Sequence, residues 1–275
     1  MAEKLKLGIG QMTTTDSIQK NTEVMIQLMQ SQGPVDLWSF PENCLFYRAD
    51  SLDPIAKIKI SDASISQLQM TVDELNCDVH LGSVPLTKAE GLFNSTIWLS
   101  PRREPQIVYD KIHLFDVDVG GTKLRESDAF TPGHRPHIVD FKGWKIGLSI
   151  CYDLRFSDLY HRYARANVDL ILVPSAFLVE TGKVHWEILL RARAIESQCF
   201  VAAAAQSGEH QFSNGKKRRT YGNSMCVHPW GNILWRSEKE GIDSYVVEMD
   251  KGEIEKVRSQ IPMPNHRRLH RSENS

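Results

Sequence analysis

Short apolar runs alternate along the chain with longer segments whose apolar residues recur at helical spacing. Runs of roughly four to eight apolar or alternating residues between turn-forming residues predict strands. We expect strands at residues 5–11, 36–40, 79–84, 94–100, 106–109, 145–150, 169–173, 200–206, 222–227, 233–236 and 244–249. The helical segments lie between them, at residues 15–30, 64–75, 157–166, 185–197 and 252–260. Thr15 or Asp16 is expected to cap the first helix.

This order of elements predicts a mixed α/β fold, because helices that alternate with strands pack on the faces of a sheet. The many strand–strand neighbours argue against a purely parallel Rossmann or barrel arrangement. Neither the glycine fingerprint of dinucleotide sites nor the phosphate-binding P-loop motif is present. No linker, repeat or low-complexity tract divides the sequence. We therefore expect one domain over residues 1–275, from which a C-terminal tail of about residues 261–275 extends.

Composition and charge narrow the class of protein. Hydrophobic residues make up 41% and charged residues 24% of the 275 positions, which excludes disordered and fibrous classes. The formal net charge of −1 gives no reason to expect nucleic acid or an anionic membrane as partner. The four basic residues at 216–219 are interpreted as a solvated surface loop. With no signal peptide or membrane span expected, a reducing cytoplasmic location is predicted.

The five cysteines, at positions 44, 77, 151, 199 and 226, are odd in number and too widely spaced for a zinc knuckle or a compact disulfide framework. The histidines form no H-E-x-x-H or similar pair, so no metal site is expected. Two interpretations of the cysteines stay open at this point. All five are small buried residues, or one of them is a nucleophile.

Three short motifs each follow a predicted strand. Glu42 lies in F-P-E-N, Lys111 in Y-D-K-I-H, and Cys151 in C-Y-D-L-R. Each motif is weak evidence alone, since a loop acid, a paired lysine and a structural cysteine are all common. Cys151 stands where a strand gives way to a helix, and such a turn exposes a side chain beside unpaired backbone N–H groups. Those groups can hold a developing oxyanion.

Together the three motifs resemble the nitrilase superfamily of carbon–nitrogen hydrolases, whose signature is a Glu–Lys–Cys triad in that chain order. The matching positions are Glu42, Lys111 and Cys151. A second glutamate, followed by a P-G turn, is usual in the family and fits at Glu126 and Pro132. The resemblance covers nearly the whole chain. It implies a four-layer α-β-β-α sandwich and a homodimer.

The resemblance also implies a mechanism. Cys151 attacks an amide carbonyl as a thiolate, for which a lowered pKa is expected, and forms a thioester. Glu42 is the general base and acid, and Lys111 and the backbone N–H of Tyr152 stabilise the oxyanion. Glu126 positions Lys111. No cofactor, metal or organic, is required.

Within the superfamily, the segments at 174–177, 189–206 and 221–225 look most like the Nit amidases, and closest to deaminated-glutathione amidases. The implied substrate is a small carboxylated amide. The alternatives are an omega-amidase acting on α-ketoglutaramate or α-ketosuccinamate, an N-carbamoyl amidohydrolase, and a true nitrilase. A binding protein that has lost catalysis is disfavoured, because the triad is complete.

Substrate carboxylates need cations, and two arginines are candidates. Arg155 lies four residues beyond Cys151, and Arg193 lies in a predicted helix, where arginines more often serve packing. Further side chains could line or wall the site. These are Tyr47, Arg48, Phe177 and His185.

Overall fold

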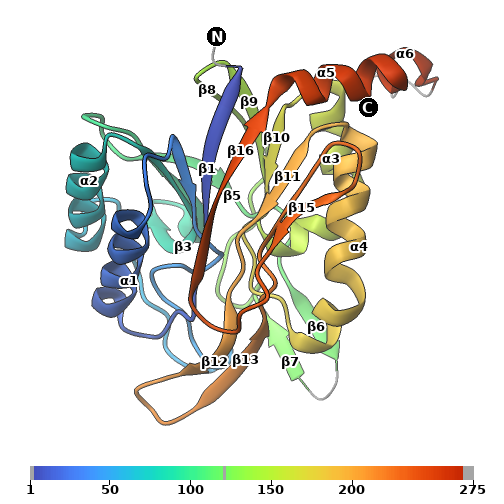
Figure 1. Ribbon diagram of the computed structural model, residues 1–275. Coiled ribbons are helices and arrows are strands. Elements are labelled where there is room, and N and C mark those ends of the chain that lie inside the picture. The colour runs from blue at the N-terminus through green and yellow to red at the C-terminus, as the bar shows by residue number, and fades with distance from the viewer. Residues whose placement is uncertain (1–2, 120–121, 269–275) are drawn as a thin grey trace.

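The computed structural model describes the chain except for residues 1–2, 120–121 and 269–275, so the end of the predicted tail lies outside the described residues. Two six-stranded sheets lie face to face, with α1 and α2 outside one sheet and α3 and α4 outside the other (Figure 1). This arrangement is the expected four-layer α-β-β-α sandwich. The helices are α1 Ile18–Ser31, α2 Ala63–Leu75, α3 Ser157–Arg165 and α4 Val179–Ser197.

The first sheet has the strand order β16-β1-β2-β3-β4-β5. Its three central strands are parallel, and antiparallel partners flank them on both sides. The strands are β1 Lys4–Gln11, β2 Leu37–Ser39, β3 Asp78–Lys88, β4 Gly91–Leu99, β5 Gln106–Asp110 and β16 Asp243–Asp250.

The second sheet has the order β15-β14-β11-β10-β9-β8 and repeats this pattern of parallel strands inside and antiparallel strands outside. The strands are β8 Ile138–Phe141, β9 Trp144–Leu148, β10 Leu170–Leu172, β11 Phe200–Ala203, β14 Met225–Val227 and β15 Ile233–Arg236. Within each sheet the parallel strands end at a common edge. The loop after β2 in the first sheet and the loop after β9 in the second lie on the same side of the sandwich, because residues of both line one cavity.

The core follows from the alternation of side chains along the strands. Leu5, Leu7 and Ile9 point from β1 into the space between the sheets, where they join the apolar residues of the second sheet. A separate cluster fills the space between the first sheet and its helices, with Trp38 and Leu68 among its members. Burial of this kind contributes roughly 25 cal/mol per Å² of apolar surface and is the main force holding the four layers together.

Two helices begin at residues other than those expected. The cap of α1 is Ser17, whose side chain accepts from the Lys20 N–H, whereas Thr15 and Asp16 turn their side chains to other donors. The α4 helix begins at Val179, a turn and a half before the predicted start at 185. Its first turns include Gly182, which packs so closely on Tyr221 that a Cβ there would lie 2.3 Å from the ring.

Two antiparallel hairpins were not expected from the sequence. They project from the same end of the sandwich (Figure 1). The hairpins are β6 Asp116–Val119 with β7 Thr122–Arg125, and β12 Ser207–Gln211 with β13 Lys217–Tyr221. The prediction of a solvated loop at 216–219 is therefore wrong over β13. Residues 217 and 219 are exposed there, while Arg218 is half-buried on the opposite face of the strand.

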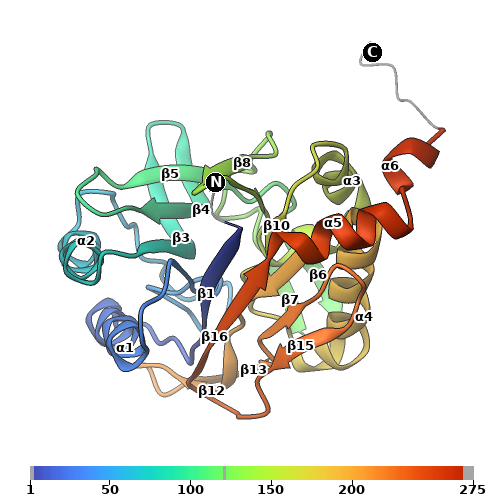
Figure 2. The same cartoon turned by 45° about the horizontal axis from the view of Figure 1, so that its top comes forward.

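The C-terminal part continues from β16 into α5 Lys251–Gln260 and the short α6 Met263–His266 (Figure 2). The Asp250 side chain caps α5 by accepting from the Gly252 N–H at 2.8 Å. All five cysteines are free and buried. No helix among the described residues is long and apolar enough to cross a membrane.

Candidate functional site

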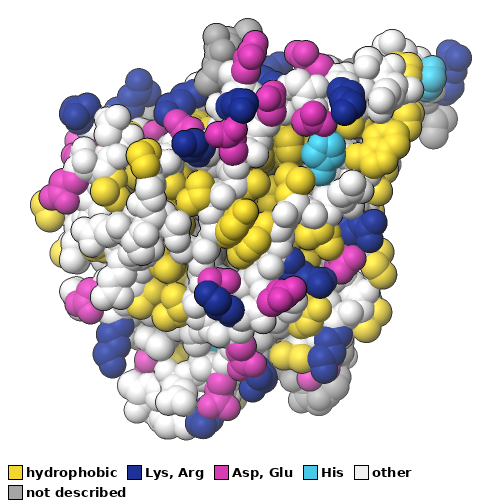
Figure 3. Space-filling model, viewed as in Figure 1, with side chains coloured by type: hydrophobic (Ala, Val, Ile, Leu, Met, Phe, Trp, Pro, Cys, Tyr) yellow, Lys and Arg dark blue, Asp and Glu magenta, His cyan; other side chains and the backbone are white. Residues whose placement is uncertain are grey.

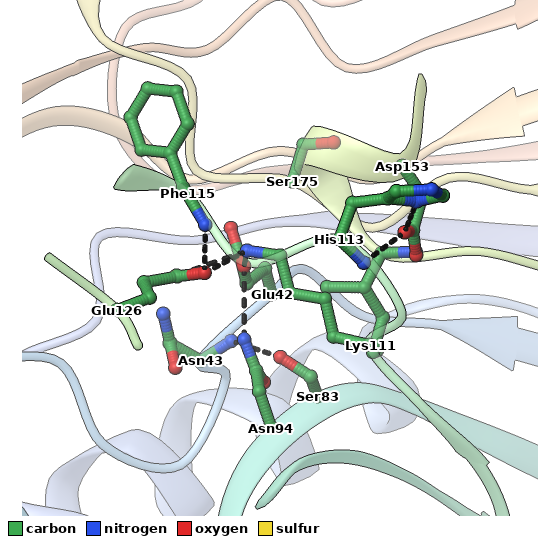
Figure 4. Close-up of polar contacts among 12 residues, drawn as sticks. Glu42, Asn43, Ser83, Asn94, Lys111, His113, Phe115, Glu126, Asp153 and Ser175 are labelled. Atoms are coloured by element: carbon green, nitrogen blue, oxygen red, sulfur yellow. Dashed lines mark hydrogen bonds and ion pairs between the residues drawn. The ribbon is translucent and has the colours of Figure 1, made fainter. Parts of the chain in front are cut away.

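Three side chains from separate segments meet at the edge where the sheets open. Glu42 follows β2, Lys111 follows β5 and Cys151 follows β9. The Lys111 Nζ lies 2.8 Å from the Glu42 Oε1, and both side chains are almost completely buried (Figure 4). Cys151 lines the same cavity as Glu42 and Lys111, and both charges affect its thiol. The three motifs that the sequence placed after strands therefore form one site.

A second carboxylate completes the environment of the lysine. Glu126 follows β7, and its Oε2 lies 2.8 Å from the Lys111 Nζ. The backbone N–H of Phe115 donates to the same oxygen at 2.8 Å, which fixes the direction of the carboxylate. The ammonium therefore lies between two carboxylates, each fixed by its own contacts.

Neighbours orient Glu42 as well. The Asn94 side-chain amide donates to its Oε1 at 3.1 Å, and the amide of Gln206 donates to its backbone carbonyl at 2.9 Å. Gly82 lets the chain pass closely, because a Cβ there would lie 2.0 Å from the carbonyl oxygen of Phe40. The strand exit that carries Glu42 is thus packed tightly against β3.

Burial and the neighbouring charges together set the pKa values of Lys111 and Glu126. Burial alone would lower the pKa of Lys111, but Glu126 and Glu42 outweigh it and raise that pKa well above its usual value. The lysine is therefore always an ammonium. Burial raises the pKa of Glu126, and Lys111 opposes that effect. A buried ammonium paired in this way supplies a fixed positive charge beside the thiol.

Cys151 stands on a sharp turn, as expected. Its φ of 46° lies in the left-handed region, which few residues other than glycine adopt. A 3-10 helix, Cys151–Arg155, follows at once, and the Cys151 N–H donates to the Pro174 carbonyl at 2.8 Å. The next N–H, that of Tyr152, makes no hydrogen bond to any described residue. It is free to meet an oxyanion.

The expectation of a lowered thiol pKa is wrong for this structure. Burial raises the pKa of Cys151 well above its usual value, and Glu42 adds to the effect. Lys111 and the backbone N–H of Ala176 act in the opposite direction but do not prevail. The nucleophile therefore rests as a thiol, and a base must take its proton when the substrate is bound.

A buried carboxylate joins the segment of Lys111 to the turn of Cys151. Asp153 accepts from the Tyr109 hydroxyl at 2.8 Å and from the Ile150 N–H at 2.9 Å. It also accepts from the His113 N–H at 2.9 Å and lies 2.7 Å from the His113 Nδ1. Four donors on two segments thus share one aspartate, which fixes the two reactive groups relative to each other.

Two cavities meet at Cys151. The larger has a volume of about 640 Å³ and opens to solvent, and the smaller has about 210 Å³. Phe115, Cys151 and Ala176 line both. The larger is otherwise lined mainly by polar and charged residues: Glu42, Asn43, Tyr47, Arg48, Asp50, Ser51, Lys111, Arg125, Glu126 and Arg218. Its charges make it the side of the site suited to a polar substrate.

The other predicted side chains are divided among these cavities and their surroundings. Tyr47 lines the larger cavity, whereas Arg155 and Phe177 line the smaller one. His185 lines neither, and its Nδ1 lies 3.0 Å from the Arg155 Nη1. Arg193 also lies outside both cavities, because its guanidinium donates to the Leu154 carbonyl and pairs with a glutamate of its own helix.

Several residues of the site were not predicted from the sequence. Asn94 and Ala176 carry no chemical signal in the sequence, since an amide and a backbone N–H occur everywhere. Asp153 gave a usable signal, as an acid two residues from the candidate nucleophile. Arg218 was hidden within a run of four basic residues. Within the described part of the chain, no group of three His, Cys, Asp or Glu side chains could hold a metal ion.

The sequence and the fold of this chain are similar to those of known carbon–nitrogen hydrolases. The carbon-nitrogen hydrolase family matches residues 6–259. A "Deaminated glutathione amidase" from Yersinia enterocolitica is 34% identical over 249 residues, covering 88% of this chain and 85% of that protein. The nitrilase and fragile histidine triad fusion protein NitFhit of Drosophila melanogaster is 38% identical over 272 residues, or 95% of this chain.

The solved structure of the C. elegans NitFhit protein superposes with a TM-score of 0.86 and 31% identity, and the match covers 98% of this chain. The fusion proteins are longer than the chain described here. The chain spans 57% of the Drosophila protein and 66% of the C. elegans chain. The likeness therefore concerns one part of each fusion protein, and it includes all the segments that form the site.

Proposed function

Because this chain belongs to the carbon–nitrogen hydrolase family, we propose that it is an amidase that uses Cys151, Glu42 and Lys111 to hydrolyse a small carboxylated amide through a thioester. One observation carries the proposal. A buried ammonium lies between two carboxylates beside a thiol that stands on a strained turn. That combination supplies a nucleophile, a base and a positive charge within one cavity.

Acylation begins with the resting thiol. As the Cys151 sulfur bonds to the amide carbon, Glu42 takes the thiol proton, so no free thiolate has to exist beforehand. The carbonyl oxygen gains the negative charge, which the ammonium of Lys111 and the N–H of Tyr152 stabilise. Glu42 then returns the proton to the nitrogen, the carbon–nitrogen bond breaks, and the amine leaves.

Deacylation repeats these steps with water. Glu42 removes a proton from a water molecule, whose oxygen bonds to the thioester carbon. The second oxyanion meets the same two donors. The carbon–sulfur bond breaks, and Cys151 takes back the proton from Glu42 as the carboxylic acid leaves. Glu126 does not react in this scheme. It holds the ammonium in place through both half-reactions.

The proposed substrate is deaminated glutathione, in which a keto group replaces the amino group of the γ-glutamyl part. Hydrolysis of its γ-amide gives α-ketoglutarate and cysteinylglycine. The arginines that line the larger cavity suit an anionic substrate of this kind. An omega-amidase acting on α-ketoglutaramate is the second candidate. It would form the same acyl-enzyme but release ammonia.

The test measures α-ketoglutarate release by the purified protein. Deaminated glutathione and α-ketoglutaramate give the same acid, so one coupled assay compares both directly. We expect the higher kcat/KM for deaminated glutathione. We also expect Cys151→Ala and Glu42→Gln to lower turnover by at least about 1000-fold, the usual effect of removing a nucleophile or its base.

An outcome in which neither amide is hydrolysed, or in which Cys151→Ala keeps its activity, would contradict the proposal. A preference for α-ketoglutaramate would favour the second candidate. Mass spectrometry of the intact protein after rapid acid quench provides an independent measurement. It should detect one α-ketoglutaryl group on the wild-type protein and none on Cys151→Ala.

The protein is further proposed to work as a homodimer in a reducing compartment. Five unpaired, buried cysteines agree with such a compartment. Val184, Ile188 and Ile195 are exposed on one face of α4, and further hydrophobic side chains gather over β15 and β16 (Figure 3). Light scattering should report a dimer that Ile188→Glu weakens. Met70→Glu, at an equally exposed position on α2, should leave it intact.

A further inference from the structure

Three arginines line the larger cavity, and none of them forms an ion pair with a described residue. They are Arg48, Arg125 and Arg218. The carboxylates of the same cavity are already engaged, since Glu42 and Glu126 bind Lys111 and Asp50 binds Lys216. Arg125 has Asp116 as a charged neighbour, so its charge is partly balanced. Arg48 also has Glu126, Asp50 and Asp53 as charged neighbours, but Arg48 and Arg218 in addition repel each other. These two are therefore the cations that an anionic ligand would stabilise most.

Arg48 is held in place by its own loop. Its Nη1 donates to the carbonyl oxygens of Ser51 and Asp53, both at 2.9 Å. The other nitrogens of the guanidinium make no hydrogen bond to a described residue. Burial lowers the pKa of Arg48, and the nearby Arg218 lowers it further while Glu126 opposes both effects. Two arginines close enough to repel each other favour an anion between them.

Arg218 lies over the ring of Tyr47, with 4.8 Å between the guanidinium carbon and the ring centroid. No described residue accepts a hydrogen bond from this guanidinium. Tyr47 is only 4% exposed, and its buried hydroxyl has no hydrogen-bond partner among the described residues. A buried hydroxyl without a partner is costly, and such groups usually meet a ligand or water. Burial raises the pKa of Tyr47 to about 12, so the hydroxyl keeps its proton and can donate.

Ion pairs and a hydrogen bond join the two segments that carry Arg48 and Arg218. Lys216, at the tip of the β12–β13 hairpin, pairs with Asp50 at 2.6 Å and with Asp53 at 2.5 Å. The side-chain amide of Asn214 also donates to Asp53, at 3.2 Å. These contacts fix the hairpin that carries Arg218 against the loop that carries Arg48. The arginines are therefore placed by the fold and are not freely moving surface side chains.

We propose that Arg48, Arg218 and the Tyr47 hydroxyl form a subsite that binds a carboxylate of the substrate and so selects anionic amides over neutral ones. The inference rests on the amidase function proposed above and adds the residues that decide its substrate class. A carboxylate accepts from a planar guanidinium fork and from a hydroxyl at once, which matches the donors present. A neutral amide would leave both arginines and the hydroxyl unpaired.

The test measures binding in a Cys151→Ala background, where no turnover occurs, so that its result is independent of catalysis. Calorimetry would compare glutaramate with glutaramide, two amides of equal length of which only the first carries a charge. N-butyrylglycine carries its carboxylate on the amine side of the amide bond, whereas glutaramate carries it on the acyl side. Comparison of the two shows which side of the substrate the subsite binds. We expect glutaramate or N-butyrylglycine to bind at least 10-fold more tightly than glutaramide.

Arg218→Met should weaken binding of the preferred anion by about 10- to 100-fold, the effect of losing a charge-assisted hydrogen-bond pair. It should change binding of glutaramide less than 3-fold, a limit set by normal variation at sites without a contact. The matched control is Arg219→Met, since Arg219 is the next residue of β13, faces solvent and pairs with Glu240. That variant should bind all three compounds as the parent does.

Tyr47→Phe removes only the unpartnered hydroxyl and serves as the second variant if Arg218→Met does not fold. It should weaken binding of the preferred anion about 3- to 10-fold, as the loss of one donor predicts. Equal losses for glutaramate and glutaramide, or equal behaviour of the Arg218 and Arg219 variants, would overturn the subsite. Catalysis without discrimination between the two amides would leave the amidase intact and refute only the subsite.

Discussion

Asp153 Oδ1 and His113 Nδ1 lie 2.7 Å apart, at the contact between the loop that follows β5 and the turn that carries Cys151. The aspartate is completely buried and accepts from the backbone of both segments. The contact joins the segment that follows Lys111 to the turn that follows Cys151. The position of one reactive group therefore depends on the other.

Asp153→Asn should lower both stability and activity. The new amide would direct a donor at the N–H and O–H groups that now donate to the carboxylate. We expect a loss of about 2–4 kcal/mol in the free energy of unfolding, measured by chemical denaturation. Since Lys111 and Cys151 would no longer be held together, kcat should fall more than 10-fold. Asp140→Asn, on the exposed side of β8, is the control and should change neither quantity.

Lys111→Met should be destabilising because it leaves two carboxylates buried without their cation. Removal of one partner from a buried pair typically costs about 3–5 kcal/mol. The double variant Lys111→Met/Glu126→Gln removes one of the stranded charges, so it should recover part of the lost stability. Activity should stay absent in both. Thermal melts of the two variants side by side would contradict this account if the double variant were the less stable.

Gly82→Ala tests the close approach of β3 to the strand exit that carries Glu42. The added Cβ would lie 2.0 Å from the Phe40 carbonyl oxygen and 2.4 Å from the Pro174 Cβ, so both segments would have to move. We expect a loss of roughly 1–3 kcal/mol, the usual effect of overpacking, together with reduced kcat. Gly33→Ala has nothing within 4 Å of its added Cβ and should behave as wild type.

Two buried histidines predict a loss of stability in acid. Burial lowers the pKa of His80 to about 3 and that of His210 to about 4, whereas a histidine in the unfolded chain titrates near 6.5. The unfolded state therefore binds more protons, so stability falls as pH drops from about 6.5 towards 4. Each histidine contributes up to about 1.4 kcal/mol per pH unit.

Denaturation midpoints between pH 7 and pH 4.5 would measure this slope. His210→Gln removes one of these groups, so its stability should depend less steeply on pH. The glutamine can still donate to the Thr14 carbonyl, which lies 2.8 Å from the His210 Nδ1. An unchanged slope in this variant would show that His210 does not titrate as its burial implies.

The sequence was informative where local chemistry and local structure coincide. Glu42, Lys111 and Cys151 each follow a strand that could be recognised from its apolar run. That the three meet in one site was predicted from the resemblance to the nitrilase superfamily. The direction in which the pKa of Cys151 shifts was not predictable, because it depends on burial by residues distant in the sequence. Local sequence cannot report how much solvent the finished fold leaves around a thiol.

Arg218 illustrates a second limit. Four adjacent basic residues are typical of a solvated surface, yet β13 turns Arg218 towards the cavity and its neighbours towards water. Which of the four side chains faces the cavity depends on the pairing of β13 with β12. β12 contains no apolar run from which that pairing could be predicted. Arg193 shows the reverse case. A helical arginine was a reasonable candidate for a substrate carboxylate, but its geometry commits it to the Leu154 carbonyl.

The raised pKa of Cys151 has a consequence for the durability of the protein. Peroxides and electrophiles attack thiolates far faster than thiols, so a cysteine that rests protonated resists oxidation between turnovers. The substrate itself is then what makes the sulfur reactive, because only a bound carbonyl lets Glu42 complete the proton transfer. We expect slow sulfinic acid formation at Cys151 in dilute hydrogen peroxide at pH 7, followed by peptide mass spectrometry. Rapid oxidation in the absence of substrate would show that the thiol is not protected in this way.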